Sequence, residues 1–471
     1  MSATHHGHPV TAREKALKIN LDPLYYGTFA EIGAGQEVVR WFFQSGGAAG
    51  TISKSISAYD MKVSDAIYGS CKRYVARDRL QAMLDYEQNL NIERLQEQRG
   101  ATTAFFTFAD TVSARSFKGN NECHGWMGIK FQPRPGAPNS QIIVHVNMKD
   151  WENAQQQEAL GMVGVNLIYG ACNLAYEPEK LLESLLDGLS TDRIEIDLIE
   201  FSGPEFAQVD NRIMSLRLVQ LGLSGAAMFG ADAHVLLPSE VLHKKPVLVE
   251  RGRFRPVTNV NLDVLRSALS AFERVSPDVQ PGETLALMEI PMSSLYTGGE
   301  VDLADFLSRA EVIAATGHTV LISDFAEYYR LARYLWRYTN RPIGLAMGSP
   351  NLKILFDESN YTKLDGGILE SFGRLFKGDL KLLIYPWLDM ATGTLMGADE
   401  VDVGESLRQL YGYLRSRGGI VPLTDADQNL LSIYSPDVLA KITGGDPGWE
   451  AMVPPQVAEA IKTRHLFGYQ A

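Results

Sequence analysis

The carboxyl-terminal half of the chain repeats one pattern of apolar and polar positions. Short runs that are apolar on both faces end in polar residues, and a stretch with the length and spacing of an amphipathic helix follows each run. Strands buried on both faces are typical of a parallel sheet, because its crossover helices cover each face. We therefore predict a βα-repeat domain over residues 191–435. Its runs lie at residues 194–201, 226–229, 246–250, 285–290, 319–324, 342–348, 380–386 and 420–425.

Eight βα units are compatible with a closed barrel as well as with an open sheet. An open, doubly wound and largely parallel sheet is favoured, because run 226–229 is short, the crossover after it has only residues 238–243 for a helix, and the segment between residues 348 and 380 is irregular. The predicted fold class is α/β, with the eight-stranded βα barrel as the alternative. Ligands of such sheets collect at the carboxyl ends of the strands. Those ends read Glu250-Arg251, Glu289, Ser323-Asp324, Gly348-Ser349, Tyr385-Pro386 and Thr424-Asp425.

The amino-terminal half has a different pattern and predicts an α+β domain over residues 21–190. Three strand-like runs are joined by short loops rich in Gly, Asn and Pro, which indicates at least some antiparallel pairing. Residues 1–20 are predicted to be a mobile tail, and residues 436–471 a helical extension. The strand-like runs lie at 103–109, 126–131 and 142–147, and helices are predicted near 31–43, 77–98, 153–169 and 177–189.

Composition and charge exclude several classes of protein. Of the 471 residues, 45% are apolar and 21% are charged, as in ordinary globular proteins. No apolar run is long enough to cross a bilayer and the amino terminus has no signal-peptide pattern, so we expect a cytoplasmic protein with no membrane partner. The net charge of −12 disfavours nucleic acid as a partner. The three cysteines match no metal-ligand spacing, so no metal site is predicted and the cofactor stays open.

The strongest candidate for binding chemistry is an Arg-rich segment directly after the run 246–250. If this segment is extended, Arg251, Arg253 and Arg255 point to one side, and three guanidinium groups make a receptor for a phosphate or carboxylate. The simpler interpretation is a set of ion pairs with the many acidic residues of the chain. The sequence leaves both interpretations open.

A second candidate is the Gly-rich segment at residues 45–60. Lys54 adds a positive charge, and Ser53 and Ser55 add hydroxyl groups, which together with exposed backbone amides are the components of a phosphate cradle. The P-loop signature is absent, because Gly50 is followed by Thr51. A polar loop between helices is the simpler interpretation.

Candidates for catalysis are single polar residues at strand ends. Asp324 and Glu289 have the chemistry of an acid, a base or a metal ligand, whereas Asp210 is more simply a helix cap. His145 and Trp126 lie in predicted strands and are expected to be packed, and His124 has no partner that the sequence identifies. No complete catalytic signature occurs. The His5-His6-Gly7-His8 match to the HxGH motif of nucleotidyltransferases lacks the preceding strand that the motif needs.

Several segments of the chain together resemble a family of bacterial proteins of about this length. Labels used within that family include nicotinate-nucleotide adenylyltransferase and TonB-dependent receptor. The family has no established activity, so the resemblance spans nearly the whole chain but supplies no catalytic residues. The receptor label conflicts with the absence of a signal peptide and of barrel-strand alternation. The segments are residues 31–37, 45–60, 201–204, 245–252 and 366–370.

Two functions from different classes follow from these patterns. The first is an enzyme that binds a nucleotide or another phosphorylated small molecule through the Arg-rich loop, with Asp324 or Glu289 in acid–base or metal chemistry and nucleotidyl transfer as one reaction it allows. The second is a self-associating scaffold, because residues 328–338 carry more aromatic and Arg residues than one buried face needs. A homo-oligomer is expected in either case. Packing between domains is the simpler interpretation of those aromatic residues.

Overall fold

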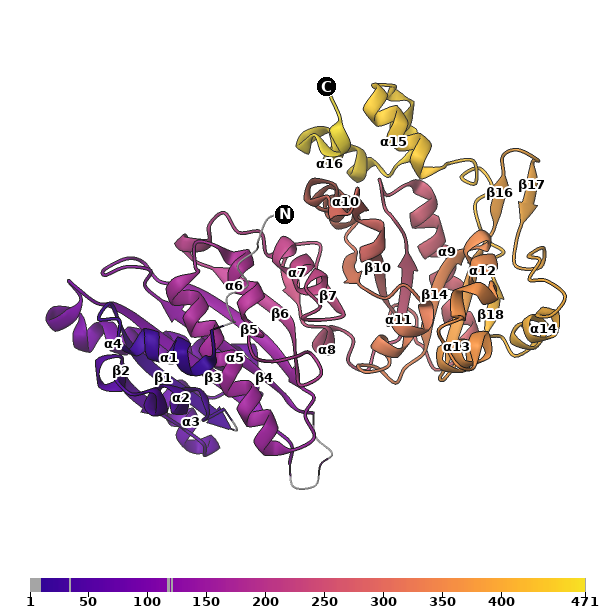
Figure 1. Ribbon diagram of the computed structural model, residues 1–471. Coiled ribbons are helices and arrows are strands. Elements are labelled where there is room, and N and C mark those ends of the chain that lie inside the picture. Colours follow the sequence, from indigo (N-terminus) through magenta and orange to yellow (C-terminus); the bar gives the residue numbers. More distant parts are fainter. Residues whose placement is uncertain (1–9, 34, 117–118, 120–121, 471) are drawn as a thin grey trace, which may run out of the picture. The chain divides into compact units, whose positions relative to one another are not determined.

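The chain folds into two compact units, each built on one large sheet (Figure 1). The computed structural model describes residues 10–33, 35–116, 119 and 122–470. Unit 1 comprises Met1–Gly225 and unit 2 comprises Ala226–Ala471. The sequence placed the domain boundary earlier, at residue 190, because it assigned the run at 194–201 to the βα-repeat region. This run instead forms a strand in the sheet of unit 1.

The sheet of unit 1 has six strands in the order β2-β1-β3-β4-β5-β6. β1 is parallel to β2 and β3, and each neighbouring pair from β3 to β6 is antiparallel, which confirms the predicted antiparallel pairing. β6 is therefore not the first parallel strand of a repeat, and that assignment was wrong. The strands are β1 (Tyr25–Gly33), β2 (Ile52–Ile56), β3 (Ala104–Ser113), β4 (His124–Phe131), β5 (Ser140–Met148) and β6 (Ile194–Ser202).

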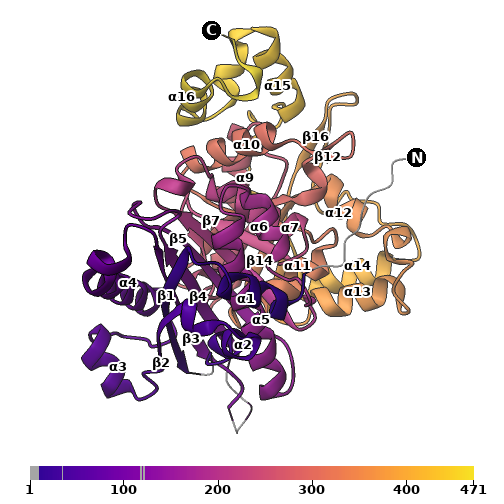
Figure 2. The ribbon, with the colours of Figure 1, turned by 60° about the vertical axis from the view of Figure 1, so that its left-hand side comes forward.

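Helices cover both faces of this sheet, which explains why β6 is apolar on both sides. Gly128 of β4 lies against Leu80 and Leu84 of α4, whereas the neighbouring Met127 lies near Gly164 of α5. Successive residues of a strand face opposite sides, so α4 and α5 lie on opposite faces (Figure 2). The helices are α1 (Ala12–Asn20), α2 (Val38–Ser45), α3 (Met61–Tyr68), α4 (Arg77–Arg99), α5 (Asn153–Asn173), α6 (Pro178–Ser184) and α7 (Asn211–Gln220).

Helix α1 corrects the prediction of a mobile tail over residues 1–20. Thr11 and Glu14 form a capping box, in which the Thr11 amide donates to Glu14 Oε2 at 2.8 Å and the Glu14 amide donates to Thr11 Oγ1 at 3.3 Å. The buried Lys15 ammonium donates to Asp187 at 2.6 Å and to Asn166 at 2.9 Å. These bonds attach the helix to the rest of unit 1. His5, His6 and His8 lie outside the described residues.

We expect Thr11→Ala to lower the unfolding free energy of unit 1 by about 1 kcal/mol, because the first turn of α1 loses its side-chain cap. Urea unfolding followed by circular dichroism measures this change. Thr102→Ala is the control, since Thr102 is exposed and caps no helix start. A loss for Thr11→Ala no larger than that for the control would contradict the role of the cap.

Unit 2 is an open, doubly wound sheet with the order β18-β15-β14-β9-β10-β13-β7-β8. The six strands from β18 to β13 are parallel. The predicted fold class is confirmed, and no barrel closes among the described residues because β18 and β8 stay at opposite edges. The strands are β7 (Ala226–Phe229), β8 (Val235–Leu236), β9 (Val247–Arg251), β10 (Leu285–Pro291), β13 (Thr319–Ser323), β14 (Ile343–Gly348), β15 (Leu380–Tyr385) and β18 (Ile420–Pro422).

Strand β7 differs from its predicted role. It runs antiparallel to β13, with Met228 opposite Leu321, instead of continuing the parallel set. Only four residues long, it has no full-length crossover helix after it, because only α8 (Pro238–Val241) and the short β8 precede β9. A parallel connection needs a longer crossover than the short link after β7 provides. β7 is therefore an antiparallel strand near the edge of the sheet. Two small hairpins are formed by β11 (Tyr296–Thr297) with β12 (Glu300–Val301), and by β16 (Trp387–Asp389) with β17 (Thr394–Met396).

Helices cover both faces of the parallel sheet of unit 2. On one face Phe272 of α9 lies near Leu248, Gly344 and Leu383, whereas the alternate residue Val249 belongs to the core cluster formed with α11 and α13. No helix that the structure describes has the length and hydropathy of a membrane span. The remaining helices are α9 (Asn259–Val275), α10 (Leu303–Ala315), α11 (Tyr328–Leu335), α12 (Ser349–Leu355), α13 (Gly367–Leu375), α14 (Arg408–Ser416), α15 (Ser435–Gly444) and α16 (Pro455–Arg464).

Candidate ligand site at the strand-order reversal of unit 2

The order of the parallel strands reverses beside β9. From β9 the chain steps outward to β10 and β13, then returns to the other side of β9 to form β14 and continues outward to β15 and β18. The carboxyl ends of β9 and β14 therefore begin connections that leave in opposite directions. In open α/β sheets, such a reversal opens a crevice between the connections, where ligands bind.

A cavity of about 710 Å³ lies at this reversal, and we call it the switch-point cavity. Its lining includes Glu250, Arg251, Gly348, Tyr385 and Pro386, which are residues that the sequence marked as strand ends. A cavity of this volume is large enough for a nucleotide-sized compound. Its other lining residues are Val260, Asn261, Val264, Ala346, Met347, Pro350, Asn351, Trp387, Leu388, Asp389, Met390, Ala391, Leu431, Ser432, Ile433, Tyr434 and Asp437.

Glu250 lines this cavity and has one side-chain oxygen that makes no hydrogen bond among the described residues. The residue is only 5% exposed, and its Oε1 accepts a hydrogen bond of 2.7 Å from Asn261 Nδ2. Its Oε2 is buried and has no hydrogen-bond partner among the described residues. Burial raises the pKa of Glu250 to about 8, and the bond from Asn261 offsets this rise only in part. Glu250 is therefore mostly protonated at neutral pH.

Hydrogen bonds at the start of helix α9 determine which oxygen of Glu250 lacks a partner. Asn261 Oδ1 accepts from the Thr258 amide at 2.9 Å and from Thr258 Oγ1 at 3.0 Å, so the amide nitrogen of Asn261 is the atom that points to Glu250. This nitrogen donates, so Glu250 Oε1 accepts, and the acid proton belongs on Oε2. Neutral Glu250 thus carries an O–H donor on Oε2, and ionised Glu250 carries an acceptor there.

Tyr385 and Asp263 form a fixed wall beside the cavity. Tyr385 Oη donates to Asp263 Oδ2 at 2.7 Å, and the Asp427 amide donates to the same oxygen at 2.9 Å. Burial raises the pKa of Tyr385, and the bond to Asp263 raises it further. Burial alone would raise the pKa of Asp263, but the bonds from Tyr385, Asp427 and Arg266 outweigh burial and lower it. Asp263 is therefore an ionised structural acceptor.

Arg251 and Glu289 neutralise each other, so neither fills the role that the sequence predicted. Arg251 Nε and Nη2 donate to the two oxygens of Glu289 at 2.7 and 2.8 Å, and Ser323 Oγ donates to Glu289 Oε1 at 2.5 Å. Two further N–H groups of Arg251 donate to the carbonyl oxygens of Phe325 and Ala326. The Glu289 side chain is fully buried. This pair fixes the ends of β9 and β10 and neutralises the charge of the Arg251 guanidinium.

Arg253 and Arg255 lie in the same loop, but the three arginines do not form one receptor. Arg255 Nε pairs with Asp305 at 2.6 Å, and Asp305 also pairs with the nearly buried Arg309 of α10. Burial lowers the pKa of Arg309, Asp305 counteracts this, and the positive charges of Arg255 and Arg253 lower it further. Arg255 and Arg309 therefore share one carboxylate, and Arg253, whose charge also acts on Arg309, is exposed to solvent. Positive charge is in excess on this side of the loop.

The other predicted site residues lie elsewhere. Asp324 is exposed and does not line the switch-point cavity. In unit 1, residues 52–56 are strand β2 rather than a phosphate cradle: Lys54 pairs with the buried Glu87, Ser53 Oγ lies 3.0 Å from Thr28 Oγ1, and Ser55 is exposed. Parallel pairing with β1 orders this segment as an edge strand, so the structure lends the predicted cradle no support. Asp210 does cap α7, by accepting from the Arg212 amide.

The aromatic residues from which self-association was inferred are packed within unit 2. Tyr329 and Tyr334 are 8% and 3% exposed and belong to a core cluster, against which Tyr328, Trp336 and Tyr338 also pack. Burial raises the pKa of Tyr328 to about 12. These side chains do not supply an aromatic surface. A homo-oligomer stays a prediction without support from this helix.

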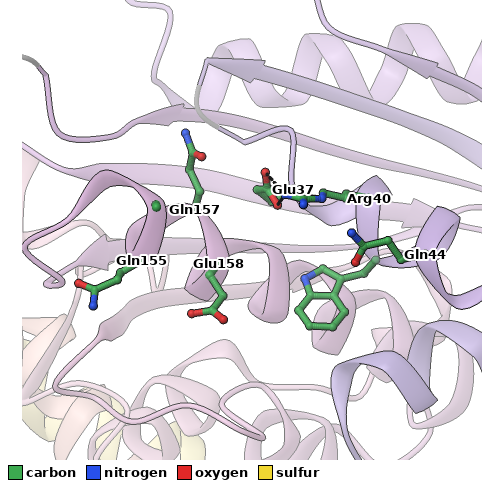
Figure 3. A pocket seen from close by; sticks show the side chains of 8 residues that line it. Glu37, Arg40, Gln44, Gln155, Gln157 and Glu158 are labelled. Atoms are coloured by element: carbon green, nitrogen blue, oxygen red, sulfur yellow. Dashed lines mark hydrogen bonds and ion pairs between the residues drawn. The ribbon is translucent and has the colours of Figure 1, made fainter.

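A second hollow, of about 480 Å³, lies in unit 1 between α2 and α5 (Figure 3). Its α2 side carries Glu37, Arg40, Trp41 and Gln44, and its α5 side carries Gln155, Gln157 and Glu158. Arg40 Nη1 and Glu37 Oε2 form an ion pair of 3.1 Å. Amides and a paired charge give this hollow little chemistry to use, so the switch-point cavity is the better candidate.

Comparisons with known proteins do not identify a function for the chain. No family model and no curated protein matches the chain. The competence/damage inducible protein CihA from Agrobacterium tumefaciens is 12% identical with a TM-score of 0.25, and the match covers 36% of this chain and 99% of that chain. The competence-damaged protein (CinA) superfamily protein from Enterobacter cloacae is 12% identical with a TM-score of 0.27, with coverage of 37% and 99%. Matches at this level carry no argument about activity.

Sequence reasoning named Glu250 as a strand end but did not select it as a site residue. The Arg-rich segment beside it drew attention because three like charges are conspicuous, whereas a lone Glu before Arg reads as one more ion pair. The relevant signal was the position of Glu250 at the end of a run that is buried on both faces. No group of three or more His, Cys, Asp or Glu side chains is arranged to hold a metal ion within the described part of the chain.

Proposed function

We propose that the switch-point cavity of unit 2 binds a nucleotide or a similar phosphorylated small molecule, with the planar or apolar body of the ligand inside the cavity and its phosphate outside, beside Arg253. The observation that carries this proposal is the buried Glu250 carboxyl group, which has one hydrogen-bonding oxygen left over and lines a cavity at the reversal of strand order. Buried polar groups usually have partners, so a ligand is a natural partner for this oxygen.

The lining of the cavity supports a ligand with an aromatic or apolar body. Trp387, Met347, Met390, Ile433 and Tyr434 are among its lining residues. Ligand sites are typically apolar and contain a small number of polar groups that fix the orientation of the ligand. Glu250 and Asn261 are suited to that orienting role, because the O–H group of neutral Glu250 meets an acceptor such as a ring nitrogen or a carbonyl oxygen of the ligand.

The distribution of charge supports a phosphate outside the cavity rather than in it. Asp389 and Asp437 line the cavity, and its one cationic lining residue, Arg251, is neutralised by Glu289. The Arg-rich loop borders the cavity, since Ser435, next to the lining residue Tyr434, donates to the Arg255 carbonyl oxygen at 2.9 Å. Unbalanced positive charge at Arg253 and Arg255 is therefore available to an anion along the same loop.

Thermal unfolding in the presence of adenosine, AMP, ATP and ribose 5-phosphate tests the proposal. A ligand at 100 times its dissociation constant is expected to stabilise unit 2 by about 2.7 kcal/mol. We expect Glu250→Leu to weaken binding of nucleoside and nucleotide alike, because leucine is close to the size of this side chain but offers neither a donor nor an acceptor. Arg253→Ala is expected to weaken only the phosphorylated ligands.

Glu405→Leu and Arg408→Ala are the matched controls, because both residues are exposed in unit 2 and neither lines the cavity. They should leave the stabilisation by each compound unchanged. The proposal fails if none of the four compounds shifts the unfolding of the wild-type chain, or if Glu250→Leu binds them as the wild type does.

A further inference from the structure

Unit 1 contains a chain of hydrogen bonds that runs across three neighbouring strands and ends at a partly exposed imidazole. Asp197 of β6 lies 2.6 Å from His145 Nδ1 of β5, measured from its Oδ1, and His145 Nε2 lies 3.0 Å from His124 Nδ1 of β4. The second oxygen of Asp197 accepts from Asn147 Nδ2 at 2.6 Å. The side chains of Asp197 and His145 are fully buried. We call Asp197, His145 and His124 the relay.

An irregularity in the sheet brings the relay together. His145 pairs with Leu198 and Val146 pairs with Ile196, so the register between β5 and β6 shifts by one residue at Asp197. Such a bulge turns the side chain of the extra residue toward a position that regular pairing does not give. Trp126, opposite His145 on β4, packs against the His145 ring with centroids 4.9 Å apart. The buried part of the relay is thus held by packing as well as by hydrogen bonds.

The hydrogen bonds assign the protons of both rings. A carboxylate only accepts, so His145 Nδ1 carries a hydrogen and donates it to Asp197. In neutral His145 the other nitrogen, Nε2, then accepts, which requires a hydrogen on His124 Nδ1. The remaining nitrogen, His124 Nε2, has a lone pair and no hydrogen-bond partner among the described residues. His124 is partly exposed, whereas the side chains of His145 and Asp197 are fully buried, so His124 is the member of the relay nearest to solvent.

We propose that unit 1 contains a second site, in which His124 Nε2 is the proton acceptor for a bound water or hydroxyl group and the buried His145–Asp197 pair takes up the resulting charge. This site is independent of the switch-point cavity of unit 2. It differs from the sequence-based expectation that His145 is merely packed, because His145 connects a buried carboxylate to a partly exposed imidazole.

Charges around His124 explain why it needs the rest of the relay. Burial lowers the pKa of His124 to about 4, His145 and Arg73 lower it as well, and Glu122 and Asp197 act in the opposite direction. His124 is therefore neutral at physiological pH and, acting alone, would be a weak base. In the relay, the ring does not have to hold the positive charge itself.

The proton transfers balance in two steps. A proton moves from the ligand O–H group to His124 Nε2 and leaves an oxyanion, while the hydrogen on His124 Nδ1 moves to His145 Nε2. His124 ends neutral, and His145 becomes an imidazolium that still donates from Nδ1 to Asp197. A buried positive charge beside a hydrogen-bonded carboxylate is much less costly than an unpaired one. Asp197 therefore acts as a positioning residue and as a counter-charge.

Ethoxycarbonylation by diethyl pyrocarbonate probes the lone pair of His124 in the full-length chain. Nε2 forms a bond to the carbonyl carbon of the probe, ethyl carbonate leaves, and the Nδ1 hydrogen passes to His145. Peptide mass spectrometry measures the rate at each histidine, with His234 as the internal reference because its side chain is 81% exposed. We expect Asp197→Asn and His145→Gln each to slow modification of His124, relative to His234, about tenfold or more.

Asp85→Asn is the matched control, since Asp85 is a half-exposed carboxylate of unit 1 outside the relay, and it should leave the ratio unchanged. A measurement on the wild type alone covers the case in which the relay variants unfold. His124 should react equally fast at pH 5.5 and pH 7.5. An ordinary imidazole of pKa about 6.5 is expected to react roughly tenfold more slowly at pH 5.5 than at pH 7.5, because most of it is protonated at the lower pH. The proposal is overturned if wild-type His124 is unreactive or slows like an ordinary imidazole. It is also overturned if folded relay variants react at the wild-type rate.

Discussion

Replacing Glu289 with alanine is expected to destabilise unit 2 by about 3–5 kcal/mol, because it removes one partner of a buried ion pair. Glu289 is fully buried and accepts hydrogen bonds from both Arg251 and Ser323. Without it, the Arg251 guanidinium, whose side chain is 11% exposed, keeps its charge next to an empty space. Urea unfolding of the full-length chain, followed by circular dichroism, measures the loss in the transition of unit 2.

The exposed ion pair between Lys462 and Glu450 is the matched control. Its side chains are 38% and 44% exposed, so Glu450→Ala should cost less than about 1 kcal/mol. The double variant Arg251→Met, Glu289→Leu removes both charges and is expected to recover part of the loss, since no unpaired charge remains. If Glu289→Ala were no more destabilising than Glu450→Ala, the Arg251–Glu289 pair would not be a structural element of the sheet.

Raising the pH from 4.5 to 8 should weaken the folded state of the wild type through Glu250. The folded-state pKa of this carboxyl is raised by burial to about 8, and its ordinary value is 4.5. Between these values the folded chain keeps a proton that the unfolded chain has lost, so the unfolding free energy falls as pH rises. The decrease amounts to at most about 4 kcal/mol. Below this window both states are protonated, and above it both are ionised.

Glu250→Gln isolates this contribution, because glutamine has the same shape and does not titrate. We expect the variant to be close to the wild type in stability near pH 4.5 and more stable than the wild type near pH 8. Denaturant unfolding of both chains at several pH values gives the difference, in which the titration of all other groups cancels. A constant difference between the two chains over this range would mean that Glu250 has an ordinary pKa.

The sequence predicted the parallel core of unit 2 because that part of the fold follows from the local pattern of apolar and polar residues. The runs that became β9, β14 and β15 are apolar on both faces, and their helical partners follow at once. Strand-end residues such as Tyr385 and Gly348 were therefore recognised before the sheet was known. The run at 226–229 was predicted to be a parallel strand, but it is antiparallel to β13. A short apolar strand has the same pattern in either orientation, so the sequence does not distinguish the two.

Strand β1 was missed for a different reason. Its sequence places Gly27 and Glu31 among apolar residues, which weakens the appearance of a buried strand. In the fold, Gly27 lies where a side chain would meet the Phe106 carbonyl oxygen, and both oxygens of Glu31 accept from the first amides of α2. Neither contact is local in sequence, so Glu31 was interpreted as the start of a helix rather than part of a strand.

The candidate sites depended on register, which the sequence does not contain. Arg251 stands opposite Glu289 because β9 and β10 are neighbours in one particular register, and this pairing removes both residues from the predicted anion site. The His145–Asp197 contact depends on a one-residue shift between β5 and β6. Residue types alone identified the chemistry that each side chain offers, whereas the spatial neighbours decide which side chains remain available.

Asn261 joins two structures that are usually independent. Its carbonyl oxygen caps α9 and its amide nitrogen holds the Glu250 carboxyl group, so one side chain connects the first turn of the helix with the cavity wall. Fraying of this turn would release Glu250, and a guest molecule that restrains Glu250 would in return hold the turn wound. Occupancy of the cavity and local melting of the helix end are thus two readouts of a single equilibrium.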